Sequence, residues 1–212
     1  MKKIIVFILL VVGGTVIYNQ FLKEPEYIKI RAIDGISTVK NSKFLEKSCN
    51  KNVAKDCYYL GEYIMTFEKN PDKNKAKSLF EKACNLNEAF GCTLLSMHFY
   101  DARPYSYDKE TYNYKKAREL YQQACDLNDG YGCALLALLI FDSEKNEEAY
   151  FNLSKKACDL EDRQGCLNLA TIYQTGDLGA IKKDSALYKR YSKLAIDYAF
   201  KSKSLSHNYH KK

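Results

Sequence analysis

Apolar and polar residues alternate with a helical period along most of the chain. Ala76, Leu79, Phe80 and Ala83 fall at i, i+3, i+4 and i+7, the spacing that places side chains on one face of an amphipathic helix. Similar stripes end at short polar stretches that contain Asn, Asp and Gly, which favour turns. The pattern therefore predicts an all-α chain of helices joined by short turns.

Four of these stripes belong to an internal repeat, and each unit carries two cysteines eight positions apart. A small residue precedes the first cysteine, Asn or Asp follows it, and leucine lies three positions beyond the second. Glycine precedes the second cysteine in three of the four units, at Gly91, Gly132 and Gly165. The cysteines of the chain form the pairs Cys49 and Cys57, Cys84 and Cys92, Cys125 and Cys133, and Cys158 and Cys166.

The length of the repeat indicates an α/α solenoid of helical hairpins. Successive first cysteines are 35, 41 and 33 residues apart, the size of one hairpin in such a fold. The second helix of each hairpin is predicted to begin near the second cysteine. Further helices are predicted to start at Asp142 or Ser143 and at Asp184, whose side chains can accept hydrogen bonds from free amides. The longest spacing is absorbed by residues 100–114, a polar, Tyr-rich segment predicted to be an exposed loop.

These patterns divide the chain into five parts. The terminal helix has no cysteine and is expected to cover the open end of the stack. The parts are a signal peptide or membrane anchor (1–22), a linker or N-terminal cap (23–38), four cysteine-paired hairpins (39–184), a C-terminal capping helix (185–204) and a basic tail (205–212).

The N-terminus is predicted to direct export. Two lysines precede an uncharged run from residue 4 to residue 17, which matches the positive and apolar regions of a secretory signal. Cleavage after Gly14 is one interpretation. The other is an uncleaved anchor that continues to Leu22, close to the length needed to span a bilayer. We therefore expect a secreted or periplasmic protein, or one anchored to the inner membrane by this segment.

The cysteine spacing constrains the path of the chain. Residues eight apart in a continuous helix are separated by about 12 Å along the axis, whereas a disulfide needs Cα atoms within about 7 Å. Bonded pairs therefore require a chain reversal, which Asn87, Asn128, Asp129 and Gly130 can provide. The repeat favours one bridge within each unit. Buried free thiols are a weaker alternative because the export signal opposes them, and zinc ligands are usually closer in sequence.

Composition and charge narrow the functional classes. The chain has only 3 prolines and 46% apolar residues, which fits a helical protein with a substantial core. Its net charge of +7 is spread over interspersed Lys and Glu, so we expect no nucleic acid partner. We also expect no metal and no cofactor, because His98 stands alone in a predicted helix and His207 and His210 lie in the tail.

The repeat resembles a known family. The strings "LFEKACNLNEAFGCTLL" and "YQTGDLGAIKKDSA" resemble the Sel-one-like repeat, and the paired cysteines resemble the Helicobacter cysteine-rich protein family of exported bacterial proteins. The resemblance covers residues 39–200 and implies a right-handed solenoid with one disulfide per hairpin. Unit one departs from the pattern, with Ser48 in place of Ala and Asp56 in place of Gly. The family also implies penicillin binding with weak β-lactamase (hydrolase) activity, or secreted factors that engage host cells.

The residues themselves do not identify a catalytic site. The S-x-x-K string of serine β-lactamases occurs at Ser37 with Lys40 and at Ser48 with Lys51, but neither "SDN" nor "KTG" accompanies it. A chain rich in Ser and Lys contains such strings by chance, so no catalytic residue is assigned. An enzyme function depends on the resemblance alone.

We favour a binding module, because solenoids present a continuous surface to an extended partner. The expected ligand is a protein, a peptide or a peptidoglycan-like molecule, with β-lactams as the alternative. The membrane is contacted only through the N-terminal segment, and the protein is expected to be a monomer. Most of the 18 tyrosines are expected in the core, and the candidate interface residues are Tyr105, Tyr107, Tyr112 and Tyr114 in the long connection.

Overall fold

The computed structural model describes residues 27–32, 35–40, 42–100, 113–176, 178–179 and 181–208. An antiparallel two-stranded hairpin, β1 (Tyr27–Ala32) and β2 (Gly35–Lys40), comes first. Helical hairpins follow it along the chain. They are α1 (Ser42–Asn50) with α2 (Ala54–Phe67), α3 (Lys73–Asn85) with α4 (Ala89–Phe99), α5 (Tyr114–Asp126) with α6 (Gly130–Glu144), and α7 (Glu147–Asp159) with α8 (Arg163–Thr175), before the single helix α9 (Ser185–Asn208).

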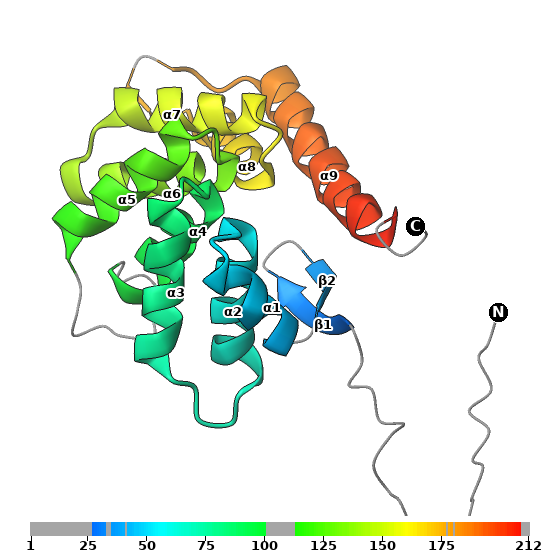
Figure 1. The fold of residues 1–212 in the computed structure, drawn as a ribbon. Helices are drawn as coiled ribbons and strands as arrows, with labels where there is room; N and C mark the ends of the chain where they lie inside the picture. The colour runs from blue at the N-terminus through cyan, green and yellow to red at the C-terminus, as the bar shows by residue number, and fades with distance from the viewer. Residues whose placement is uncertain are drawn as a thin grey trace, which may run out of the picture.

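The helical hairpins stack into an arc (Figure 1). Each first helix packs on the second helix of its own hairpin and on that of the preceding one. Consecutive second helices also contact one another, α2 with α4, α4 with α6 and α6 with α8. They therefore form the inner layer, and α3, α5 and α7 lie outside it (Figure 1). The predicted α/α solenoid is confirmed.

The repeated small residues allow the two helices of a hairpin to approach closely. A Cβ placed on Gly91, Gly132 or Gly165 would lie 2.6, 2.7 or 2.4 Å from the Cβ of the alanine that precedes the first cysteine. Real Cβ atoms do not come so close, so glycine is required there. The leucines three positions beyond the second cysteines are all buried in the core: Leu60, Leu95, Leu136 and Leu169.

Each chain reversal is a short turn with one residue in the left-handed conformation. That residue is Asn52, Asn87 or Asn128 in the first three units, with φ of 64°, 60° and 64°, and Glu161 in the fourth. The amide of Asn87 donates to the carbonyl of Cys84 at 2.9 Å, and the following amide donates one residue further back. These bonds satisfy the last carbonyl groups of the first helix, as in other left-handed helix caps.

One predicted helix start is wrong and another is confirmed. Asp142 and Ser143 lie within α6, and α7 is instead capped by Asn146, which accepts a hydrogen bond from the amide of Ala149 at 3.0 Å. Short polar side chains are tolerated in the exposed last turn of a helix as well as at its start, so the pair was ambiguous. Asp184 caps α9 as predicted, accepting bonds from two amides of its first turn.

The two ends of the described chain meet at the opening of the arc. Strand β1 contacts α2 and strand β2 contacts α9, so the β-hairpin lies between the first and last helical elements (Figure 1). The segment expected to be a linker or cap thus contains strands, and α9 continues past residue 204 to Asn208. The alternation of apolar and basic residues in "YIKIRA" is a strand signal that the helical repeat does not share.

Several predicted features lie outside the described residues. They include the signal or anchor at residues 1–22, most of the long connection at residues 101–112, and the last four residues of the basic tail. In the part of the chain that the structure describes, no helix has the length and apolar character needed to cross a membrane.

Candidate functional site

Disulfides close the elbow of every cysteine-paired hairpin. The predicted partners are joined in all four units, with Cα atoms 4.5 to 4.7 Å apart, and no cysteine of the chain is free. All eight sulfur-bearing side chains are buried. Because such bonds persist where thiols are not kept reduced, they indicate an oxidising, extracytoplasmic environment.

Half-buried aromatic rings form a path along the second helices. Tyr59 of α2, Phe90 of α4 and Tyr131 of α6 pack at the edge of one core cluster. The ring centroid of Tyr58 lies 4.3 Å from that of Tyr59 and 5.4 Å from that of Phe90. The Tyr131 hydroxyl lies 4.0 Å from the sulfur of Met97. The path therefore crosses three consecutive units on the inner layer.

Carboxylates stand at the N-terminal ends of three second helices, two of which also carry the aromatic path. Glu88, Asp129 and Asp162 immediately precede α4, α6 and α8. Asp129 accepts hydrogen bonds from the Thr93 hydroxyl at 2.5 Å and from an amide of its own helix at 3.1 Å. Asp162 likewise caps α8 through an amide at 3.0 Å. Carboxylates suit these positions because the first amides of a helix have no helical partner.

Burial and mutual repulsion act on these carboxylates. Desolvation raises the pKa of Asp162, backbone hydrogen bonds oppose the shift, and the charge of Asp129 adds to it. Desolvation also raises the pKa of Glu88, against the attraction of Lys55 and with the repulsion of Asp129. Asp129 thus repels acidic neighbours in the units on either side of it. The row places three carboxylates along one edge of the inner layer, where a basic partner group would relieve their repulsion.

The predicted interface tyrosines are described only in part. Tyr105, Tyr107 and Tyr112 lie outside the described residues, and Tyr114 is the first residue of α5. Its side chain is half-buried and its hydroxyl donates to the carboxylate of Glu144 at the end of α6. Tyr114 thus ties the two helices of its hairpin together, and an interface role stays a prediction.

The serines of the S-x-x-K strings lie in different elements. Ser37 is in β2, and Ser48 is in the last turns of α1. The carbonyl of Ser48 accepts hydrogen bonds from the amides of Lys51 at 3.0 Å and Val53 at 3.2 Å, so this string forms the reversal of the first hairpin. Among the described residues, no three His, Cys, Asp or Glu side chains are grouped to hold a metal ion.

His98 is buried in the inner layer rather than exposed. Its Nε2 lies 2.9 Å from Oε1 of Glu62 in α2, and its ring stacks on Phe80 of α3 with a centroid distance of 5.6 Å. These contacts join the first two units. The sequence pattern did not reveal this pair because its members are 36 residues apart.

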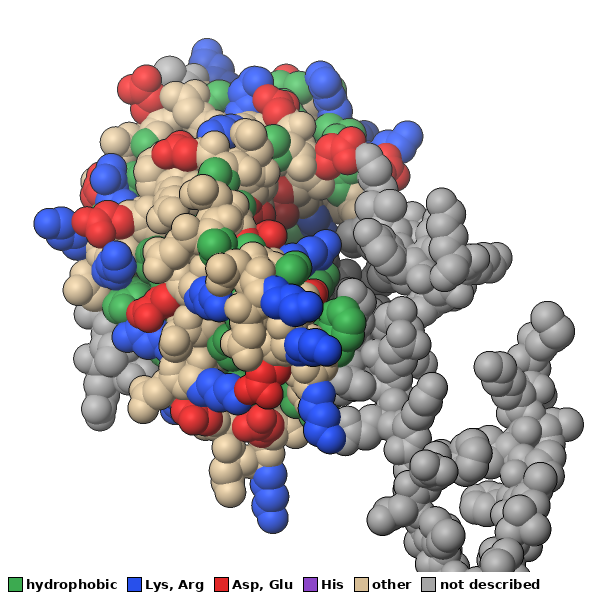
Figure 2. All heavy atoms as spheres, in the orientation of Figure 1, with side chains coloured by type: hydrophobic (Ala, Val, Ile, Leu, Met, Phe, Trp, Pro, Cys, Tyr) green, Lys and Arg blue, Asp and Glu red, His purple; other side chains and the backbone are tan. Residues whose placement is uncertain are grey.

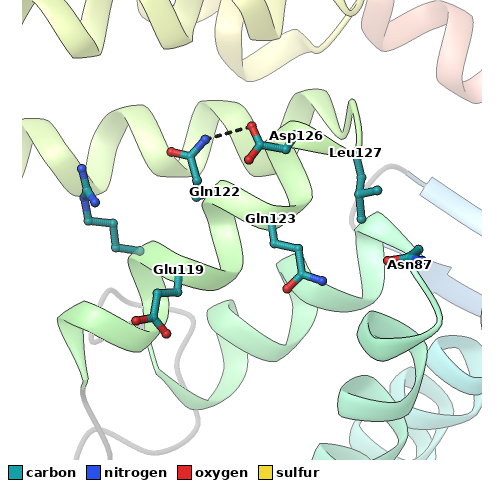
Figure 3. A pocket seen from close by; sticks show the side chains of 7 residues that line it. Asn87, Glu119, Gln122, Gln123, Asp126 and Leu127 are labelled. Carbon is teal, nitrogen blue, oxygen red and sulfur yellow. Dashed lines mark hydrogen bonds between the residues drawn. The ribbon is translucent and has the colours of Figure 1, made fainter.

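An open depression lies on the outer side, between α5 and the elbow that joins α3 to α4 (Figure 3). Its wall includes a hydrogen bond from Nε2 of Gln122 to Asp126 at 3.0 Å. On the face shown in Figure 2, acidic and basic side chains are interspersed. The depression is lined by Asn87, Arg118, Glu119, Gln122, Gln123, Asp126 and Leu127.

Comparisons with solved structures show the same fold. A Sel1 repeat protein from Oxalobacter formigenes matches with a TM-score of 0.63 at 18% identity, covering 74% of this chain and 63% of that one. The protective antigen c5321 of uropathogenic Escherichia coli, which has the SLR fold, matches with a TM-score of 0.61 at 16% identity, covering 73% and 32%. This chain therefore spans less than two thirds of either protein.

Helicobacter pylori cysteine rich protein B shares 29% identity over 59% of this chain and 94% of its own, with a TM-score of 0.46. Among curated proteins, none matches the sequence significantly. The Sel1 repeat model matches residues 48–88, 96–129 and 163–200, more than half of the chain. With its stacked hairpins and its repeated Ala, Gly and Leu positions, the chain belongs to the Sel1 repeat family, whose helical repeats generally serve as protein-interaction modules.

Proposed function

We propose that this protein is an exported binding protein that holds an extended segment of a partner protein or peptide against its second helices. The observation that supports this is the coincidence of two rows on one layer. Tyr59, Phe90 and Tyr131 supply half-buried rings on α2, α4 and α6. Glu88, Asp129 and Asp162 supply negative charge at the starts of α4, α6 and α8. No covalent chemistry is part of the proposal.

The chemistry of the two rows favours a partner with both apolar and basic side chains. Aromatic rings provide large contact areas and lose little conformational entropy when they bind. Acidic groups at successive units favour Lys or Arg and accelerate association with a basic partner. The four disulfides hold the hairpins in place before binding, so less ordering is required when the complex forms.

The proposal is tested by selecting peptides from a displayed random library with the oxidised protein. Selected peptides are expected to carry basic residues next to apolar ones. Tyr131→Ala and Asp129→Asn are each expected to weaken their binding roughly tenfold or more, as for central interface residues. Lys115→Ala, an exposed change on the outer helix α5, serves as the control and should leave the affinity unchanged.

Affinities that respond to Lys115→Ala but to neither inner-layer variant would contradict the assignment of binding to the inner layer.

The compartment is a separate part of the proposal. We place the protein in the periplasm or outside the cell, either released by cleavage after Gly14 or held by an uncleaved N-terminal helix. The intact mass of the mature protein distinguishes these two forms.

A further inference from the structure

Two exposed leucines stand at the elbows of the second and third hairpins. Leu86 and Leu127 immediately follow α3 and α5, and they are 38% and 37% exposed. A single exposed leucine is ordinary on a protein surface, but these two occupy the same position of consecutive units. Leu127 and Asn87, the neighbour of Leu86, line the same depression (Figure 3). The two leucines therefore belong to one edge of the stack.

Each leucine begins a string of residues that also contains a carboxylate and a ring. The strings are LNEAF in the second unit and LNDGY in the third. Their carboxylates immediately precede α4 and α6, and their rings are half-buried in the first turns of these helices. The chain thus crosses each elbow from an exposed leucine through a carboxylate to a ring on the inner layer. We call this surface the elbow edge, and it consists of Leu86, Glu88, Phe90, Leu127, Asp129 and Tyr131.

The first and fourth units do not have the complete string. The first has Lys51 in place of the leucine and Lys55 in place of the ring. In the fourth, Leu160 is half-buried against the core and Gln164 replaces the ring. Both units nevertheless reverse in a short turn and close their disulfides. The hairpin turn therefore does not require the string, and its repetition in the two central units indicates another role.

The two strings are about one helix spacing apart. Helices α4 and α6 contact each other, and packed helices lie about 8–10 Å apart. The Thr93 hydroxyl of α4 donates to Asp129 at 2.5 Å, so the start of α6 lies directly against α4. A polyproline II helix advances about 9.3 Å in one turn of three residues. Residues three apart in such a segment would therefore face equivalent side chains of the two units.

We propose that the elbow edge binds a polyproline II segment of a partner protein in which an apolar and a basic residue recur at every third position. The apolar residues contact the leucines and the rings, and the basic residues face Glu88 and Asp129. Such a segment is already extended before it binds, so less conformational entropy is lost. This inference rests on the proposed function and adds the conformation and the sequence register of the partner.

The test compares two synthetic peptides of equal composition by fluorescence polarisation with the oxidised protein. Acetyl-(Leu-Lys-Pro)₄-amide places the apolar and the basic residues at every third position. Its shuffled isomer has no two lysines three positions apart. The periodic peptide is expected to bind roughly fivefold more tightly or better, because only its side chains match both units at once. Equal affinities, or tighter binding of the isomer, would overturn the proposal.

Leu127→Asn is expected to weaken binding of the periodic peptide roughly fivefold, because it removes an exposed apolar contact. Phe67→Ala is the matched control. Phe67 is 44% exposed at the end of α2 that lies opposite its elbow, so its substitution should leave the affinity unchanged. Should Leu127→Asn fold poorly, Leu86→Asn tests the equivalent contact in the second unit. Leucine variants that bind no more weakly than Phe67→Ala would place the peptide elsewhere and defeat the proposal.

The outcomes separate this inference from the proposed function on which it rests. If Tyr131→Ala weakens the binding of library-selected peptides while the two synthetic isomers bind equally, the inner-layer surface stands and the register is wrong. If no peptide depends on Tyr131, both proposals fail.

Discussion

At the scale of single residues, small side chains determine how closely the helices of a hairpin pack. A Cβ on Gly165 would lie 2.4 Å from Cβ of Ala157 and 2.6 Å from the backbone nitrogen of Cys158. The backbone cannot yield as a flexible side chain can. The first unit has Asp56 and Ser48 at these two positions, yet its disulfide spans a similar Cα distance of 4.7 Å. Its packing therefore accommodates a Cβ that the other units exclude.

Gly165→Ala is expected to lower the free energy of unfolding by about 1–3 kcal/mol, because the added methyl overpacks the contact with α7. Asp56→Ala is the matched control, since that position already carries a Cβ, and its effect should stay within about 0.5 kcal/mol. Urea unfolding of the oxidised variants measures both. Equal losses in the two units would contradict the steric explanation.

Asn128 allows a second test at the scale of single residues, of how the left-handed conformation in the turn affects stability. Its φ of 64° lies in the left-handed region. Asn128→Ala is expected to destabilise the protein by about 1 kcal/mol, since an ordinary side chain with a Cβ disfavours this conformation. Asn128→Gly should be nearly neutral, because glycine adopts it readily. Thermal unfolding of the two variants should rank glycine above alanine, and the opposite order would refute this role.

At the scale of elements, the ends of the helices combine a structural role with an electrostatic one. Asp129 and Asp162 cap α6 and α8, and their charges repel each other across the unit boundary. From the sequence, Asp129 was predicted only as part of a chain reversal, and Asp162 was not singled out. Their arrangement as one row depends on stacking, because the residues are about one repeat apart along the chain.

Asp162→Asn should change the pH dependence of stability without removing the cap, since Asn caps as well as Asp. Burial raises the pKa of Asp162 in the folded state above its unfolded value of about 3.9. Protonated Asp162 therefore contributes fully to the free energy of unfolding below that pH. This contribution is lost as the pH rises through the folded pKa. The variant should therefore gain stability relative to the original protein as the pH rises above about 4. Urea unfolding across this range tests this, and parallel stability curves would contradict it.

At the scale of the whole molecule, the disulfides and the stacked hairpins provide the stability together. The loop-entropy relation gives about 2.5 kcal/mol for a loop as short as these, or on the order of 10 kcal/mol for four. This is similar to the total stability of an ordinary domain. The arc also brings β2 to α9, so the ends of the described chain support each other.

Reduction of all four disulfides is therefore expected to unfold the protein at 37 °C, whereas the oxidised form stays helical. Far-UV circular dichroism with and without a phosphine reductant measures this. Peptide mapping without reduction provides the control, and it should show one bridge per hairpin. A reduced protein that keeps its full helical signal would mean that packing alone is sufficient.

The sequence by itself determined the helical repeat, the hairpin reversals and the disulfide pairing. These depend on local spacing, since the period of the apolar stripes and the eight-residue separation of the cysteines allow few alternatives. Only the tertiary structure decided which residues from different units meet. The pair of His98 with Glu62 and the row of carboxylates arise because stacking brings together side chains about one repeat apart. The start of α7 also required the structure, because a short polar side chain suits either end of a helix.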